Sequence, residues 1–193
     1  QNVSMEFEKG NSYGFVGPNG CGKSVFFKTL CGYSLLTEGQ VIYRGKIIGK
    51  EQDFIDDAGI VIEEPEFTNS SSGLENLKIL AEIQKKISEA EIIEVLKQFD
   101  LYEDRNKKVG KYSVGMKQKL RLAQAVMEKP QVLILDEPMN GLDKKSVKKV
   151  EDILKAFVEN GGTLMTSHIE QQVEACCKIV YEIDGGEILR VTD

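Results

Sequence analysis

The chain alternates between two hydrophobic periods, one typical of strands and the other typical of helices. Short apolar runs that are followed by glycine, proline or polar residues predict strands within residues 12–17, 58–65, 132–138 and 163–168. In residues 58–65 the apolar strand is followed by acids and a proline. Two further segments, residues 38–49 and 178–191, predict β-hairpins that turn at Arg44-Gly45 and at Asp184-Gly185-Gly186.

Longer amphipathic segments between these strands predict three helices. One begins at Lys23 and ends at Gly32, one begins at Ser113 and ends before Pro130, and one spans Val147 to Val158 before Gly161-Gly162. Strands that alternate with helices indicate a mostly parallel sheet with helices on both faces. We therefore expect an α/β fold, with antiparallel hairpins beside the parallel strands.

The segment from residue 67 to residue 112 has a different character, being Ser-rich at first and then charged and helix-patterned, with no strand candidate. Ser72 with Glu75, and Ser88 with Glu91, fit the capping box of a helix start. Two apolar stripes follow these caps: Leu77, Leu80, Ile83 and Ile87, and then Ile92, Leu96 and Phe99. We expect residues 67–112 to form a small helical lobe inserted into an α/β core of residues 1–66 and 113–193.

Composition and charge exclude several classes of function. A chain of 193 residues suits one large domain, and its net charge of −6 argues against a general nucleic-acid binder. Its longest aliphatic run, Val132–Leu135, is far too short to cross a bilayer, which needs about 20 apolar residues. The polar start at Gln1 is unlike a signal peptide and reads as part of a strand, so we expect an N-terminally truncated domain.

The four cysteines are Cys21, Cys31, Cys176 and Cys177, and their spacing matches no zinc site. We expect reduced cytosolic thiols that mostly pack in the core.

The stretch "GPNGCGKS" fits the phosphate-binding pattern G-x-x-x-x-G-K-S/T and lies between a predicted strand and a predicted helix, as that pattern requires. Glycines let backbone N–H groups wrap the phosphates of a nucleotide. Lys23 is expected to reach the β- and γ-phosphates, and the Ser24 hydroxyl to bind Mg²⁺. The expected nucleotide-binding residues are Gly17, Pro18, Asn19, Gly20, Cys21, Gly22, Lys23 and Ser24.

The strand "VLILDEP" presents Asp136 and Glu137 side by side at its end. Successive strand side chains point to opposite faces, so the two acids are expected to have different tasks. Asp136 suits the Mg²⁺ shell, and Glu137 suits orienting and deprotonating the water that attacks the γ-phosphate. The alternative is a pair of solvated acids at a strand end.

Two more residues suit the same edge of the sheet. His168, the only histidine, ends a predicted strand, and parallel strands place their C-terminal ends where ligands bind, so it is expected to contact the γ-phosphate. The alternative is a packed or solvated histidine. Ser113 is an expected N-cap, and a helix start attracts anions, although a capped helix alone would explain it.

The order of these motifs resembles that of the ATP-binding-cassette ATPases over nearly the whole chain. "GPNGCGKS" resembles the P-loop of this family, "VLILDEP" the strand with the magnesium ligand and the catalytic base, "NGLD" (residues 140–143) the D-loop, and His168 the switch histidine. "YSVGM", at residues 112–116, resembles the family signature LSGGQ and keeps Ser113 and Gly115. The resemblance implies an ATPase with the P-loop NTPase (RecA-like) fold that uses ATP and Mg²⁺, with Lys23, Glu137 and His168 as its catalytic residues.

The resemblance also implies a head-to-tail dimer, in which the helix that begins at Ser113 caps the γ-phosphate held by a second copy or by a related ATPase. On this interpretation Ser113 and Gly115 are small so that a phosphate can approach the N–H groups of the helix.

The sequence departs from the family pattern at three places. The adenine-stacking aromatic residue that the family carries upstream of the P-loop would precede Gln1. The signature has Tyr112, Val114 and Met116 in place of Leu, Gly and Gln. The loop after the strand "GIVI" normally presents a Gln to Mg²⁺, and here that position is Glu63, which we expect to be a metal ligand; a solvated acidic loop is the alternative.

The segments "IEEP" and "YSVGMKQ" are similar to the corresponding segments of bacitracin- and lantibiotic-export ATPases of bacteria. This resemblance implies a cytoplasmic subunit that is attached to the inner face of the membrane by a separate integral-membrane permease, with no nucleic-acid partner. Two alternatives are a soluble cassette ATPase of translation or DNA repair, and a P-loop kinase that acts on a small molecule.

Overall fold

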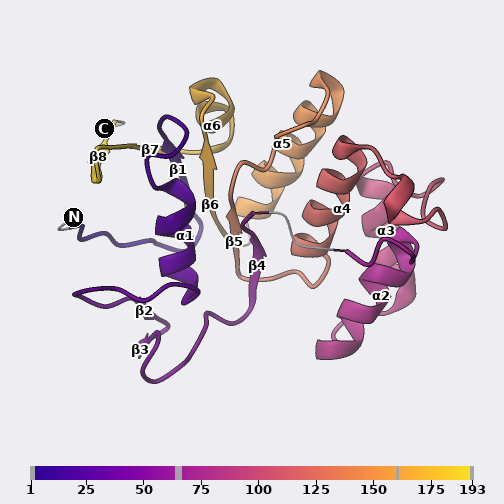
Figure 1. Ribbon diagram of the computed structural model, residues 1–193, viewed down its shortest axis with the longest axis horizontal. Coiled ribbons are helices and arrows are strands. Elements are labelled where there is room, and N and C mark those ends of the chain that lie inside the picture. The colour runs from indigo at the N-terminus through magenta and orange to yellow at the C-terminus, as the bar shows by residue number, and fades with distance from the viewer. Residues whose placement is uncertain (1–2, 64–66, 160, 192–193) are drawn as a thin grey trace.

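A six-stranded sheet lies at the centre of the computed structural model, which describes residues 3–63, 67–159 and 161–191. Its strand order is β4-β5-β6-β1-β7-β8 (Figure 1). The strands are β1 (Ser12–Val16), β4 (Ala58–Val61), β5 (Val132–Leu135), β6 (Gly162–Ser167), β7 (Ile179–Asp184) and β8 (Glu187–Arg190). All neighbouring pairs are parallel except β7 and β8, which form the predicted closing hairpin. The predicted α/β class and mostly parallel sheet are confirmed.

Side chains of the sheet enter two apolar cores, one on each face. Leu133 and Leu135 of β5 belong to the core that includes residues of α4, α5 and α6, whereas Ile134 packs in the core with Phe27 of α1. This division follows from the alternation of side chains along a strand. Every residue of β6 is buried, because this strand lies between β5 and β1 and is covered on both faces.

The helices α1 (Lys23–Cys31), α4 (Val114–Val126) and α5 (Lys144–Val158) lie where the sequence predicts them. Gly32 ends α1 in the left-handed region with a φ of 87°, a conformation that glycine adopts at little cost. The seven-residue helix α6 (Glu170–Cys176) was not predicted, and Ile169 at its N-cap position gives it no side-chain cap.

The strand predicted at the start of residues 58–65 is confirmed as β4, which ends at Val61. Glu63, expected in the loop after this strand, has a φ of 59°, which lies outside the β region. Glu64 and Pro65, also in that loop, lie outside the described residues. The hairpin at Arg44-Gly45 is confirmed, but its strands β2 (Ile42–Tyr43) and β3 (Lys46–Ile47) have only two residues each and form a separate sheet.

The helices α2 (Gly73–Gln84) and α3 (Glu89–Gln98) lie beside α4 at one end of the molecule (Figure 1), and a short 3₁₀ helix (Val109–Lys111) follows them. Both predicted capping boxes are present. One position of a predicted apolar stripe is wrong, because Ile83 is 74% exposed, whereas Ala81, which was not predicted, is buried. No helix in the described part of the chain is both long enough and apolar enough to span a membrane.

Candidate functional site

Residues 17–24 connect β1 to α1, so the predicted phosphate-binding loop lies at the C-terminal end of a central strand. Gly20 and Gly22 have φ values of 82° and 108°, and a Cβ at either position would meet no atom within 4 Å. These backbones therefore border open space. Gly17 is small for another reason, since a Cβ there would lie 2.3 Å from the carbonyl oxygen of Ile183.

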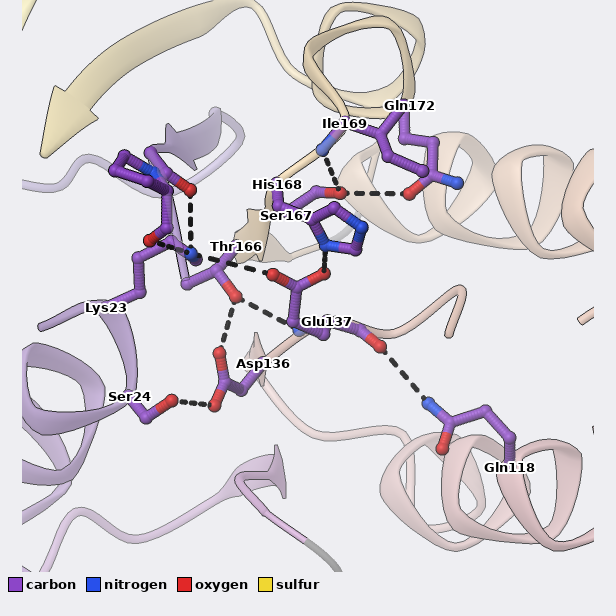
Figure 2. A network of polar contacts seen from close by, with 12 residues as sticks. Lys23, Ser24, Gln118, Asp136, Glu137, Thr166, Ser167, His168, Ile169 and Gln172 are labelled. Atoms are coloured by element: carbon purple, nitrogen blue, oxygen red, sulfur yellow. Dashed lines mark hydrogen bonds and ion pairs between the residues drawn. The ribbon is translucent and has the colours of Figure 1, made fainter. Parts of the chain in front are cut away.

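The Lys23 ammonium is folded back onto this loop. Its Nζ donates to the carbonyl oxygens of Gly17 and Pro18 at 2.8 and 3.1 Å, and the residue is only 6% exposed (Figure 2). A buried cation needs partners, and a nucleotide phosphate is a stronger acceptor than a neutral carbonyl. The loop thus holds one concentrated positive charge beside the open space over the glycines.

Asp136 follows β5 and lies between two hydroxyl groups. The Ser24 hydroxyl donates to Oδ2 at 2.5 Å, and the Thr166 hydroxyl donates to Oδ1 at 2.5 Å. The three residues come from the start of α1, the end of β5 and the end of β6. Parallel strands bring them to one edge of the sheet, where such sheets bind ligands.

Glu137 lies one residue further along and faces the other side of the site. Its Oε1 is 3.7 Å from Lys23 Nζ, and its Oε2 is 2.9 Å from His168 Nδ1 (Figure 2). Oε1 is buried and makes no hydrogen bond with the residues described, so the ion pair with Lys23 is its polar contact there. A buried carboxylate oxygen in this state suits a water molecule as its partner.

The backbone of Glu137 is held in the left-handed region, with a φ of 47°. For a residue with a Cβ this conformation costs roughly 1–2 kcal/mol, so the surroundings must maintain it. The Thr166 hydroxyl accepts the N–H of Glu137 at 3.0 Å, and the Gln118 amide approaches the carbonyl of Glu137 at 3.4 Å. Thr166 and Gln118 are two residues of the site that the sequence analysis missed, because no binding pattern in the sequence singles them out.

The predicted residues Lys23, Ser24, Asp136, Glu137 and His168 therefore form one network. Two side chains of this network are suitable ligands for Mg²⁺. Ser24 and Asp136 supply the oxygen atoms that this ion prefers, on one side of the loop. The described residues contain no group of three or more His, Cys, Asp or Glu that could hold a metal by themselves. This fits Mg²⁺, which usually keeps water and substrate phosphates as its remaining ligands.

Glu63 does not take part in this network. Its carboxylate forms an ion pair with Lys28, and its side chain is 63% exposed. Lys28 lies four residues after Ser24 in α1, on the same face of the helix and one turn away. The structure thus holds the predicted metal ligand one helical turn from the predicted metal site.

Ser113 and Gly115 also lie outside the network. Ser113 is exposed and caps α4, with its hydroxyl accepting the N–H of Met116 at 3.2 Å. Gly115 has a structural reason to be small that the sequence analysis missed. A Cβ at Gly115 would lie 2.9 Å from the carbonyl oxygen of Gly141, in the segment "NGLD".

The four cysteines are free, as predicted. Burial raises the pKa of the Cys31 and Cys176 thiols to about 12, and it raises the pKa of the Cys177 thiol as well. Cys21 is half-buried in the phosphate-binding loop.

Comparison with known proteins gives three kinds of match. The chain matches the ABC transporter family over residues 1–140. It is 38% identical to the uncharacterized ABC transporter ATP-binding protein YybJ of Bacillus subtilis, over 97% of this chain and 86% of that protein. It is 34% identical to the lantibiotic transport ATP-binding protein SrtF of Streptococcus pyogenes, over 97% and 81% of the two chains.

A further relative is the bacitracin transport ATP-binding protein BcrA of Enterococcus faecalis, which is 32% identical over 97% of this chain but only 62% of its own length. Among solved structures, the ATP-binding cassette MJ0796, a dimer in a post-hydrolysis state bound to ADP and Pi, superposes with a TM-score of 0.87 at 20% identity. That match covers 100% of this chain and 90% of the cassette, and it shows the fold.

Proposed function

The chain belongs to the ABC transporter family of ATPases, and from this premise we propose that it hydrolyses ATP to drive a separate integral-membrane permease. The observation that carries the proposal is the convergence of Lys23, Asp136, Glu137 and His168 from three neighbouring strands. A phosphate-binding cation, a magnesium ligand and a candidate general base then surround the space beside the loop.

In the proposed reaction, the backbone N–H groups of the loop and the Lys23 ammonium bind the β- and γ-phosphates of ATP. Ser24 and Asp136 would hold Mg²⁺, which neutralises the charge on the phosphates. Glu137 orients the attacking water and accepts its proton at Oε1, the oxygen beside Lys23. His168 holds the second oxygen, Oε2, and presents its ring toward the γ-phosphate.

The proposed active form is a dimer of two cassettes, either two copies or this chain with a related ATPase. In it the start of α4, with Ser113 and Gly115, completes the site of the other cassette, since the N–H groups of a helix start attract anions. Residues 67–112 act as a helical lobe that carries α2 and α3, and residues 1–66 and 113–193 form the ATP-binding core. The similarity of this chain to MJ0796, a bacterial ABC transporter cassette with a solved dimeric structure, supports this arrangement.

The relatives named for lantibiotic and bacitracin transport support a role in an exporter. On this proposal the cassette lies on the cytoplasmic face of the membrane, attached through the permease. The test uses the full-length protein and a multi-span membrane protein, if its gene neighbours that of this chain. We expect Mg²⁺-dependent ATP hydrolysis that rises when the membrane protein is added.

Two results would contradict parts of this proposal. Hydrolysis that is unaffected by any membrane partner would favour a soluble ATPase without a transport role. Transfer of phosphate to an added small molecule, with no release of inorganic phosphate, would favour a kinase.

A further inference from the structure

The helix α4 contacts the loop that carries Glu137 at two places. The Nε2 amide of Gln118 donates to the carbonyl oxygen of Pro138 at 2.9 Å. It also approaches the carbonyl oxygen of Glu137 at 3.4 Å (Figure 2). Three residues earlier in α4, Gly115 lies so near the carbonyl of Gly141 that a Cβ would come within 2.9 Å of it. The loop from Glu137 to Gly141 therefore follows the first turns of α4 closely.

Gln118 has a fixed orientation in this contact. It is 5% exposed, and its Oε1 accepts a hydrogen bond from the Arg121 guanidinium at 3.1 Å. Because a guanidinium only donates, the oxygen of the amide must face Arg121 and the NH₂ group must face the two carbonyls. Such a buried amide is costly to leave without its partners.

The other end of the contact is the strained backbone of Glu137. Its N–H is bound by Thr166 of β6, and its carbonyl faces Gln118 of α4. The direction of the Glu137 carboxylate is thus set by two elements, one on each side of the residue. A displacement of α4 would shift the carbonyl of Glu137, whereas the hydrogen bond to Thr166 of β6 would keep its N–H in place.

We propose that Gln118 is a positioning residue that ties the placement of Glu137 to the position of α4. The inference rests on the proposed function, in which the start of α4 binds the nucleotide of the other cassette. Ser113 and Gln118 are five residues apart, or about 7.5 Å along the helix axis, so a movement of the capped end reaches the loop through a short rigid segment. Occupation of one ATP site then adjusts the catalytic base of the other.

The experiment compares two substitutions in the full-length protein. Gln118→Met removes the amide at nearly constant volume, and Gln118→Glu keeps an acceptor for Arg121 but has no N–H for the carbonyls. For both variants we expect kcat to fall about tenfold, since small displacements of a catalytic group are costly. We expect the affinity for a fluorescent ATP analogue to change less than about twofold, because Lys23 and Ser24 are untouched. We expect a Hill coefficient for ATP above 1 in the wild type and a value closer to 1 in both variants.

The matched control is Gln124→Met, a half-buried glutamine further along α4, which should leave kcat and the Hill coefficient unchanged within about twofold. Normal kcat and cooperativity in Gln118→Glu would overturn the inference, because the contact with Arg121 would then be sufficient. A wild-type Hill coefficient of 1 would overturn it too. Circular dichroism checks that the variants fold. If Gln118→Met does not fold, the kinetics of Gln118→Glu test the inference. Wild-type protein without ATPase activity would overturn both this inference and the proposed function.

Discussion

Lys23 Nζ lies 3.7 Å from Glu137 Oε1, so the loop that is proposed to bind phosphate and the residue that is proposed to activate water already share an ion pair. Both side chains are largely buried, with 6% and 18% of their surfaces exposed. Removing one member of a buried ion pair leaves the other charge without a partner, which is destabilising.

Lys23→Ala is expected to weaken ATP binding about tenfold to a hundredfold, since a hydrogen bond to a charged group contributes roughly 1.5–3 kcal/mol. The measurement is a titration with a fluorescent ATP analogue. Lys78→Ala, in α2, is the control, since Lys78 pairs with Glu89 away from the loop, and it should bind with wild-type affinity. Unchanged binding by Lys23→Ala would show that the loop does not bind the phosphates.

Glu137→Gln is expected to leave ATP bound but to lower the rate of hydrolysis about 10²–10⁴-fold, the usual effect of losing a general base. Because hydrolysis would no longer release the two cassettes, an ATP-dependent dimer should accumulate. Single-turnover hydrolysis and size-exclusion chromatography with ATP measure the two effects. Near-normal turnover, or elution as a monomer with ATP, would count against the base role and the dimer.

Thr166→Val is expected to lower both activity and stability. Thr166 is fully buried, and its hydroxyl is bonded to the Asp136 carboxylate and to the N–H of Glu137. Leaving such groups without a partner costs about 1–3 kcal/mol. Urea denaturation and the ATPase rate would measure the loss.

Thr163 offers a matched control for this prediction within the same strand. It is 1% exposed, and its hydroxyl has no hydrogen-bond partner in the part of the chain that the structure describes. Thr163→Val should therefore be neutral or slightly stabilising. Equal losses in the two variants would mean that the hydroxyl of Thr166 has no special role.

Glu63 and Lys28 lead to a prediction about magnesium. If the Glu63 carboxylate is a metal ligand, Mg²⁺ must compete for it with the Lys28 ammonium. Lys28→Met should then lower the Mg²⁺ concentration for half-maximal hydrolysis, whereas Glu63→Gln should weaken the metal dependence and keep turnover. Lys78→Met, which breaks an ion pair with Glu89 elsewhere, is the control. Identical Mg²⁺ curves for all four proteins would exclude a metal role for Glu63.

Acid is expected to destabilise the protein through the caps of its helices. The Ser72 backbone N–H and hydroxyl lower the pKa of Glu75 below its ordinary value of 4.5, and the Ser146 N–H lowers the pKa of Asp143. A lowered folded-state pKa gives stability that is complete above the ordinary pKa and is lost as the pH falls through the folded value. Thermal unfolding from pH 6 to pH 3 should therefore be less pH-dependent in Glu75→Gln, whereas Glu82→Gln, at an exposed site further along α2, should resemble the wild type.

Much of the fold follows from local signals in the sequence. The capping boxes at Ser72 and Ser88 and the glycine after α1 mark helix ends, because they act through hydrogen bonds within a few residues. Helix α6 lacks such a signal, since its N-cap residue is Ile169. The stripe on α2 was misjudged at Ile83, because spacing alone does not tell which residues of the helix are covered by its neighbours.

The candidate site was predictable only where a motif lies in one continuous stretch. Lys23, Ser24, Asp136 and Glu137 belong to such stretches. Thr166 and Gln118 have no assigned position in such a motif, and their partners lie 30 and 20 residues away along the chain. Their contacts arise from the pairing of β5 with β6 and from the packing of α4, which a single sequence does not reveal.

The mutual fit of Gly115 and Gly141 has an evolutionary consequence. A side chain at Gly115 would strike the carbonyl of Gly141, and a Cβ at Gly141, whose φ is 72°, would come within 2.8 Å of Val114. Two segments that are 26 positions apart thus restrict each other within a single chain. Relatives that carry a larger residue at one position should show a compensating change at the other, so these positions are expected to covary even in members that have lost the ability to hydrolyse ATP.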